Sequence, residues 1–237
     1  MTNYQQVLSH KQTRIFQAEK LSAPRDFFIP DVIHNIATED NENNPPLILE
    51  IGAGKGKHAL SFATMHPDKH LIAIERTRNK FEAFTKLFIQ QNPTNLTPIH
   101  ADAIAWIVHA IAPNSIATIY LLYPNPEQHN PNQQWLNMPF FEFLLSRLKV
   151  GGEVVLATNI DAYMNNAEHQ ALEVWQLPSK RHQISADSQR THFEVKYLAR
   201  EETCWQLTMT KPENYKTRFD LWNTSALNTN ANNESVK

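Results

Sequence analysis

The amino-acid sequence predicts an α/β fold in which a doubly wound, mostly parallel sheet ends in an antiparallel hairpin. From Leu47 onward, short apolar runs alternate with segments of helix length, which is the pattern of repeated strand–helix–strand crossover units. The second observation concerns glycine. The chain has five glycines, and three of them, Gly52, Gly54 and Gly56, directly follow the first apolar run. A Rossmann-like sheet of this kind binds its ligand at the loop after the first strand.

The predicted strands are short, largely apolar and often β-branched, as strands buried on both faces should be. They span residues 47–51, 70–75, 96–101, 116–123 and 153–158. Helices are predicted between them over 56–65, 78–91, 103–110, 139–149 and 161–174. Two further strand-like runs, 191–199 and 203–211, are joined by the polar residues Arg-Glu-Glu and are predicted to form the hairpin.

Composition changes along the chain divide it into three parts. Residues 1–46 are predicted to be an N-terminal arm and linker, because they are polar and end in an acidic stretch rich in asparagine and proline. The folded domain is predicted over 47–211. Residues 212–237 are polar and rich in asparagine, so a mobile tail is expected there.

Bulk properties exclude several classes of protein. The net charge of -2 argues against binding of nucleic acid by overall charge alone. No apolar run approaches the ~20 residues of a membrane-spanning helix, and residues 1–16 lack the apolar core of a secretory signal. Cys204 is the single cysteine, and the eleven histidines are scattered. We therefore expect a cytoplasmic protein without a membrane association, an internal disulfide or a metal site.

Four interpretations of the glycine loop can be compared. A phosphate-binding loop needs GxxxxGK[ST], but the fifth position after Gly52 is Lys57. A dinucleotide fold needs GxGxxG, but here Gly56 comes one residue early. S-adenosylmethionine is bound by methyltransferases that have an acidic residue followed by GxGxG, as in LEIGAGKG at residues 49–56. The fourth interpretation is a tight turn that binds no ligand.

Two acidic residues at later strand ends favour S-adenosylmethionine. Glu75 ends the second predicted strand, where a carboxylate can accept both ribose hydroxyls of a nucleoside, although an NAD enzyme has the same feature. Asp102 follows the third strand, where a methyltransferase contacts adenine and a dinucleotide fold requires no acid. Either residue could instead be a helix N-cap.

The order of several motifs resembles the tRNA guanine-N7 methyltransferases, a family of class I S-adenosylmethionine-dependent enzymes. The motifs are LEIGAGKG, IAIER, HADA, LLYPNPEQH, LKVGGEVVLATNIDAY and THFE, and they cover roughly residues 47–211. The family's TxFE motif precedes a terminal strand that begins WDL, and Thr191 and Trp205 keep that interval. The resemblance implies methyl transfer to N7 of guanine in tRNA.

The resemblance also implies roles for individual residues. The implied cofactor-binding residues are Glu50, Gly52, Gly54, Gly56, Glu75, Arg76, Asp102 and Ala103. The implied substrate residues are His129, Asn159, Thr191, His192, Phe193 and Glu194. The position of the family's catalytic aspartate is occupied by Asn125, that of the next tryptophan by Glu127, that of a substrate-contacting lysine by His129, and that of a second aspartate by Asn159.

These replacements change the charge of the site. Guanine N7 has an exposed lone pair, so methyl transfer needs no general base, but a nearby carboxylate favours the cationic product. Asn125 keeps the shape of aspartate without its charge. Asp161 and Glu194 are the candidates to supply the missing carboxylate.

The charge pattern bears on the RNA partner. Between residues 102 and 173, seven acids face only Arg147 and Lys149, so this stretch attracts phosphate weakly. Basic residues elsewhere either hold an RNA backbone or form a solvated face. They are Arg76, Arg78, Lys80, Lys86, Lys180, Arg181, Arg190, Lys196 and Arg200. The sequence thus leaves three functions open: a tRNA guanine-N7 methyltransferase, a methyltransferase of the same fold with a changed substrate, or a non-catalytic cofactor-binding protein.

Overall fold

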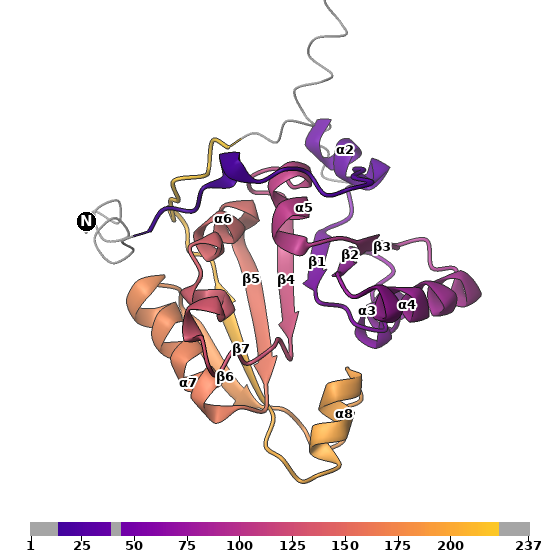
Figure 1. Ribbon diagram of the computed structural model, residues 1–237, viewed down its shortest axis with the longest axis vertical. Coiled ribbons are helices and arrows are strands. Elements are labelled where there is room, and N and C mark those ends of the chain that lie inside the picture. Colours follow the sequence, from indigo (N-terminus) through magenta and orange to yellow (C-terminus); the bar gives the residue numbers. More distant parts are fainter. Residues whose placement is uncertain (1–13, 39–43, 223–237) are drawn as a thin grey trace, which may run out of the picture.

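A seven-stranded sheet with helices on both faces forms the centre of the computed structural model, which describes residues 14–38 and 44–222 (Figure 1). The strands are β1 (Leu47–Ile51), β2 (His70–Glu75), β3 (Leu96–His100), β4 (Ile116–Leu122), β5 (Leu148–Thr158), β6 (Ser179–Gln183) and β7 (Trp205–Thr210). Their order is β3-β2-β1-β4-β5-β7-β6. The first five pair in parallel, and β7 runs antiparallel to both β5 and β6. The predicted doubly wound sheet with a terminal antiparallel pair is therefore confirmed.

The predicted helices between the first five strands are also confirmed. The helices are α2 (Asp31–Thr38), α3 (Lys57–Met65), α4 (Arg78–Gln91), α5 (Ala103–Ala110), α6 (Phe140–Arg147), α7 (Asp161–His169) and α8 (His192–Leu198). A π-helical turn, η5 (Gln170–Val174), continues α7, and the short 3-10 turns are η2 (Ala18–Lys20), η3 (Pro131–Gln133) and η4 (Trp135–Asn137). Within the described ranges, no helix combines the length and apolar character needed to cross a bilayer.

The alternation of side chains along β1 explains the two helical layers. All five residues of β1 are buried. Leu49 packs in a cluster with Trp106 of α5 and the phenylalanines of α6, whereas Ile48 packs in a second cluster with residues of α3 and with Phe84 of α4. Successive residues of a strand point to opposite faces, so a strand covered on both sides is apolar throughout.

The predicted hairpin has the right second strand and the wrong first one. Residues 203–211 contain β7, but residues 191–199, predicted to be a strand, contain helix α8. The side chain of Thr191 caps this helix by accepting a hydrogen bond from the main-chain nitrogen of Glu194 at 2.9 Å. The partner of β7 is β6, whose sequence SKRHQ has no apolar alternation because it is a largely exposed edge strand.

The described part of the N-terminal arm packs on the helices that cover one face of the sheet. The ring of Phe16 lies 5.1 Å from that of Phe140 on α6, centroid to centroid. The indole nitrogen of Trp106 on α5 donates to the carbonyl of Phe28 at 3.3 Å. The arm follows the domain surface rather than extending away from it (Figure 1).

The prediction of a mobile tail over 212–237 is wrong for residues 212–222. Tyr215 and Phe219 are buried, and the hydroxyl of Tyr215 donates to the carbonyl of Trp175 at 2.7 Å. The buried guanidinium of Arg147 donates to the carbonyl of Phe219 at 2.7 Å. A few aromatic side chains fix this segment although its composition is polar. Residues 223–237 lie outside the described residues.

Candidate active site

The glycine loop joins β1 to α3 at the carboxyl edge of the sheet. Gly52 and Gly54 have φ of 83° and 60°, a conformation that favours glycine. The main-chain nitrogen of Gly54 donates to the carboxylate of Glu75 at 2.8 Å. A Cβ added at either glycine would meet no atom within 4 Å, so the outer side of the loop is open. The loop can therefore approach a ligand closely.

Gly56 has a different role from the other two glycines of the loop. It precedes α3 and has a φ of 79°, and a Cβ at this position would lie 2.0 Å from the ring of Phe84. Gly56 lies outside the linings of the two pockets described below. The prediction that it binds the cofactor is not supported by this placement, because the close packing of α4 accounts for the glycine.

A first pocket of about 330 Å³ lies where β1, β2, β3 and β4 end. It contains most of the residues that the sequence singled out for the cofactor, together with Asn125 from the loop after β4. The predicted residues in its lining are Gly52, Gly54, Glu75, Arg76, Asp102, Ala103, Asn125 and Phe193. The topology thus brings together residues that are up to 141 positions apart, from Gly52 to Phe193.

A second pocket, also of about 330 Å³, lies along the same glycine loop. It includes Glu50 from β1 and the residues Thr191, His192 and Phe193 at the start of α8. Both pockets share Gly52, Gly54, Lys80, Leu122 and Phe193. The two spaces therefore adjoin each other, and the first turn of α8 closes one side.

The carboxylates of Glu75 and Asp102 are oriented by main-chain amides. Glu75 is buried, and its two oxygens accept from the nitrogens of Thr77 at 2.6 Å and Gly54 at 2.8 Å. Asp102 caps α5 through Oδ1, which accepts from Ile104 and Ala105. The N-cap interpretation therefore applies to Asp102, but its Oδ2 lies 3.7 Å from Arg76 and still lines the first pocket.

Buried and charged groups surround the second pocket. Oε2 of Glu50 lies 3.0 Å from Nδ1 of His58, and both side chains are buried. The two atoms are not aligned as a hydrogen bond, and neither has another hydrogen-bond partner among the described residues. Nearby, burial and the positive charges of Lys57 and Lys55 lower the pKa of His192. The pocket therefore combines a buried acidic wall with a basic rim.

The loop after β4 has an unusual backbone. Tyr123 and Glu127 have φ of 51° and 46°, values that residues other than glycine rarely adopt. Between them, Nδ2 of Asn125 donates to Oε1 of Glu127 at 2.6 Å. The carbonyl of Pro126 accepts from Nε2 of Gln134 at 2.9 Å. These contacts hold the loop over the first pocket.

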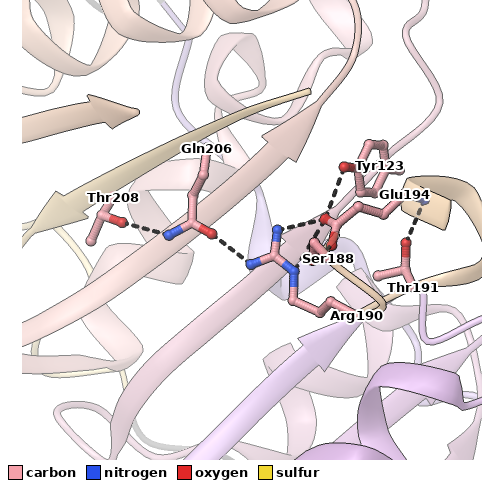
Figure 2. Close-up of polar contacts among 7 residues, drawn as sticks. All are labelled: Tyr123, Ser188, Arg190, Thr191, Glu194, Gln206 and Thr208. Atoms are coloured by element: carbon pink, nitrogen blue, oxygen red, sulfur yellow. Dashed lines mark hydrogen bonds and ion pairs between the residues drawn. The ribbon is translucent and has the colours of Figure 1, made fainter. Parts of the chain in front are cut away.

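A network of side chains ties α8 to the same loop (Figure 2). The carboxylate of Glu194 is fully buried and accepts from the hydroxyls of Tyr123 and Ser188 and from two nitrogens of Arg190. Burial opposes ionisation of Glu194, but the bonds from Ser188 and Tyr123 and the charge of Arg190 outweigh it, so the pKa of Glu194 is lowered. Burial and the neighbouring Cys204 and Glu194 raise the pKa of Tyr123.

This network changes the interpretation of Glu194. Its carboxylate receives four hydrogen bonds, which is close to the full acceptor capacity of the group. Arg190 continues the network to Gln206 on β7 (Figure 2). Glu194 therefore anchors α8 and does not provide a free charge to the pocket, contrary to its predicted roles as a substrate residue and as a replacement carboxylate.

Three other predicted residues lie outside the linings of both pockets. Asn159 donates to Glu202 at 2.6 Å, and His129 is exposed. Asp161 accepts from the indole nitrogen of Trp205 at 2.7 Å and lies 3.8 Å from Arg181. Asp161 is therefore paired away from the site and does not replace the missing carboxylate.

Sequence reasoning missed several residues that build the site. His58 lies beside Glu50 and Ser188 holds Glu194, and neither was singled out. Lys80 and Arg190 were named only as basic residues for RNA, whereas Lys80 lines both pockets and Arg190 holds Glu194. The spacing of Arg190 and Glu194, four positions apart, is typical of an ion pair on a helix, but the segment was predicted to be a strand.

A family model described as "Putative methyltransferase" matches residues 44–207. Curated relatives include tRNA (guanine-N(7)-)-methyltransferases from three bacteria. The protein from Shewanella piezotolerans is 30% identical over 138 residues, that from Hydrogenovibrio crunogenus 32% over 120, and that from Pseudomonas fluorescens 30% over 165. The matches cover 57%, 50% and 69% of this chain, and the chain spans 57%, 50% and 64% of those proteins.

Solved structures of methyltransferases share the fold. The 16S rRNA methyltransferase KamB aligns with a TM-score of 0.58 and 12% identity, over 78% of this chain and 96% of that one. A methyltransferase from Pyrococcus furiosus aligns with a TM-score of 0.55 and 16% identity, over 71% and 76%. At these identities the similarity shows the fold alone.

Proposed function

Because the chain belongs to the methyltransferase family whose model matches residues 44–207, we propose that it transfers a methyl group from S-adenosylmethionine to N7 of guanine in tRNA. The observation that carries this proposal is the lining of the first pocket. Gly52, Glu75, Asp102 and Asn125 come from the ends of four different strands and meet there. This is the edge of a doubly wound sheet at which nucleoside ligands bind.

The residues of the first pocket fit the nucleoside part of the cofactor. Each oxygen of Glu75 uses one acceptor position for a main-chain amide and keeps a second one for a ribose hydroxyl. Oδ2 of Asp102 and the nearby Ala103 would face the adenine. Gly52 and Gly54 leave room for the cofactor because no side chain projects from them.

The second pocket fits the amino-acid part. It joins the first pocket along Gly52, Gly54 and Leu122, so a ligand with a nucleoside and an amino-acid end can extend from one space to the other. Lys55 and Lys57 would place positive charge near the carboxylate of that end. S-adenosylmethionine, when bound, supplies an electrophilic methyl group on a positively charged sulfur.

Guanine would enter from the side of the first pocket formed by the loop after β4. Exposed basic side chains that follow β2 and lie on or beside α8 are the candidates to contact RNA phosphates. The side chains of Arg76 and Arg78 are 80% and 82% exposed, and Lys196 and Arg200 are exposed on and beside α8. Two of the basic residues predicted for RNA are less accessible, with side chains only 23% and 21% exposed: Arg190 pairs with Glu194, and Arg181 contacts Trp205 and Glu168. A tRNA substrate also implies a cytoplasmic location.

The proposal is tested by transfer of labelled methyl from S-adenosylmethionine. Unmodified bulk tRNA, the same tRNA already methylated at guanine N7, other RNA and a small-molecule extract are supplied separately, and the products are digested to locate the label. We expect label on guanine N7 of the unmodified tRNA and none on the premethylated control.

The other outcomes separate the two alternatives. Label only in other RNA or in the extract would show a methyltransferase with a changed substrate. No label in any pool, with cofactor binding confirmed by calorimetry, would show a non-catalytic cofactor-binding protein. Either result would overturn the tRNA assignment.

A further inference from the structure

The loop after β4 carries a carboxylate two positions beyond the asparagine that sequence reasoning placed at the catalytic position. We propose that Glu127 supplies the negative charge that stabilises the positively charged purine formed by methylation, and that Asn125 orients this carboxylate. The inference rests on the proposed function and names Glu127 as the residue that stabilises the charge formed during methyl transfer. Both residues belong to the lining of the first pocket, which also includes Gly52 and Asp102.

The contact between the two residues defines what each can offer a ligand. Nδ2 of Asn125 donates to Oε1 of Glu127 at 2.6 Å. Among the described residues, no hydrogen bond involves Oε2 of Glu127 or Oδ1 of Asn125. The pair therefore keeps one carboxylate oxygen and one amide oxygen free as acceptors, together with the second N–H of the Asn125 amide. Such a pair suits a ring that carries N–H donors and gains a positive charge.

The backbone of the loop gives the carboxylate a defined direction. Glu127 has a φ of 46° and Tyr123 a φ of 51°, so left-handed residues stand on both sides of Asn125. Nonglycine residues keep this conformation only where surrounding contacts impose it. Those contacts are the hydrogen bonds from Gln134 to Pro126, from Asn166 to Gln134, and from Tyr123 to the buried Glu194.

The other carboxylates near the site are committed elsewhere. Glu194 has four donors on its buried carboxylate, and Asp161 is paired with Trp205 and Arg181 outside the pocket. Glu75 and Asp102 are fixed by main-chain amides at the ends of β2 and β3, on the side assigned to the nucleoside. Glu127 is the acid of this pocket that stands on the loop after β4.

The chemistry of the step defines the role of this charge. The lone pair of guanine N7 forms the bond to the methyl carbon, and the bond from that carbon to the donor sulfur breaks with its electron pair left on sulfur. No proton moves, and the positive charge passes from sulfur to the purine ring. A fixed carboxylate beside the ring stabilises that charge more in the product and transition state than in neutral guanine.

The first test measures binding without the cofactor, so it does not depend on activity. The affinities for guanosine monophosphate and 7-methylguanosine monophosphate are compared by calorimetry at mildly acidic pH, where the methylated ring keeps its positive charge. The wild-type protein is expected to prefer the methylated nucleotide by about tenfold, and Glu127→Gln to lose this preference. Glu202→Gln is the matched control, because it removes a carboxylate bonded to an asparagine at the same 2.6 Å outside the pocket.

The second test measures methyl transfer to tRNA. Glu127→Gln is expected to lower kcat by about tenfold or more with an unchanged KM for the cofactor, and Asn125→Asp in the same chain is expected to restore the rate. Rescue would show that the charge matters and not the shape of the loop, and melting temperatures verify folding of each variant.

The outcomes distinguish this inference from the proposed function. If the wild-type protein and Glu127→Gln methylate tRNA equally, Glu127 has no such role and the proposed function stands. If the wild-type protein methylates no guanine, the proposed function fails, and the nucleotide preference alone decides the role of Glu127. A wild-type protein without that preference would overturn the inference in either case.

Discussion

The carboxyl edge of the sheet is built differently on its two sides. On the side of β2 and β3, the carboxylates of Glu75 and Asp102 accept hydrogen bonds from main-chain amides of the following turns. On the side of β4 and α8, the carboxylates of Glu127 and Glu194 accept from side chains, namely Asn125 in one case and Tyr123, Ser188 and Arg190 in the other.

This difference indicates which side of the site can change when the substrate specificity of the protein evolves. A carboxylate that is held by main-chain amides stays in place as long as the backbone does, whatever the neighbouring side chains are. A carboxylate held by side chains moves or disappears when one of them is replaced, and another can take over its charge. We therefore expect the nucleoside side to keep its cofactor-binding function. The residue replacements that distinguish this chain are expected on the substrate side.

The largest effect is expected from Glu75→Gln on the nucleoside side. The glutamine side chain has no charge, and its NH2 group would face the main-chain N–H of either Gly54 or Thr77. The contact with the ribose and the conformation of the glycine loop are therefore both weakened. Hydrogen bonds to charged groups contribute roughly 1.5 to 3 kcal/mol, so the affinity for S-adenosylhomocysteine should fall by up to about a hundredfold. Calorimetry measures it, with the exposed Glu82→Gln as control. An unchanged affinity would show that the nucleoside does not bind at Glu75.

On the substrate side, Glu194→Gln is expected to act on stability. The substitution leaves Arg190 without its ion pair and puts an amide nitrogen among donors in a buried network, which should lower the free energy of unfolding by about 2 kcal/mol. Urea unfolding measures this change, and Glu201→Gln on the exposed turn after α8 is the control. If both variants unfold alike, Glu194 does not anchor α8.

The same anchor predicts a pH dependence. The pKa of Glu194 is lowered from its ordinary value of 4.5, so the folded state binds this proton less readily than the unfolded state does. Its contribution to stability is fully present above the ordinary value and is lost as the pH falls through the lower, folded value. The difference in unfolding free energy between wild type and Glu194→Gln should be constant above about pH 6 and shrink below the ordinary range of glutamate. A difference that grows on acidification would contradict this assignment.

The nucleoside side could be predicted from the sequence because local signals determine it. Buried parallel strands are recognised by their apolar runs, and an acid at a strand end is placed by the strand itself, as Glu75 and Asp102 are. The glycine spacing located the loop, and the close approach of Phe84 is sufficient to explain the glycine at position 56.

The substrate side depends on contacts that a sequence does not reveal. The segment HFEVKYL has a pattern compatible with both a short strand and a short helix, and the cap at Thr191 decides for the helix. The hydrogen bond between Asn125 and Glu127 forms with a left-handed backbone conformation at Glu127. A glycine would have indicated this conformation in the sequence, but the residue is a glutamate. Glu194 likewise becomes an anchor only through partners in the loop after β4 and in the loop before α8.

The smallest effect is expected from Asn125→Asp alone, although it restores the aspartate implied by the resemblance. The new carboxylate would stand within about 3 Å of that of Glu127, and two acids at this distance cannot both ionise freely, so the site gains little charge. The single-turnover rate of methyl transfer to tRNA should therefore change by less than about threefold. Glu202→Asp, a substitution outside the pocket, is the control for effects of a substitution that do not involve the pocket. A rise of about a hundredfold would mean that the carboxylate is needed at position 125 and that Glu127 does not replace it.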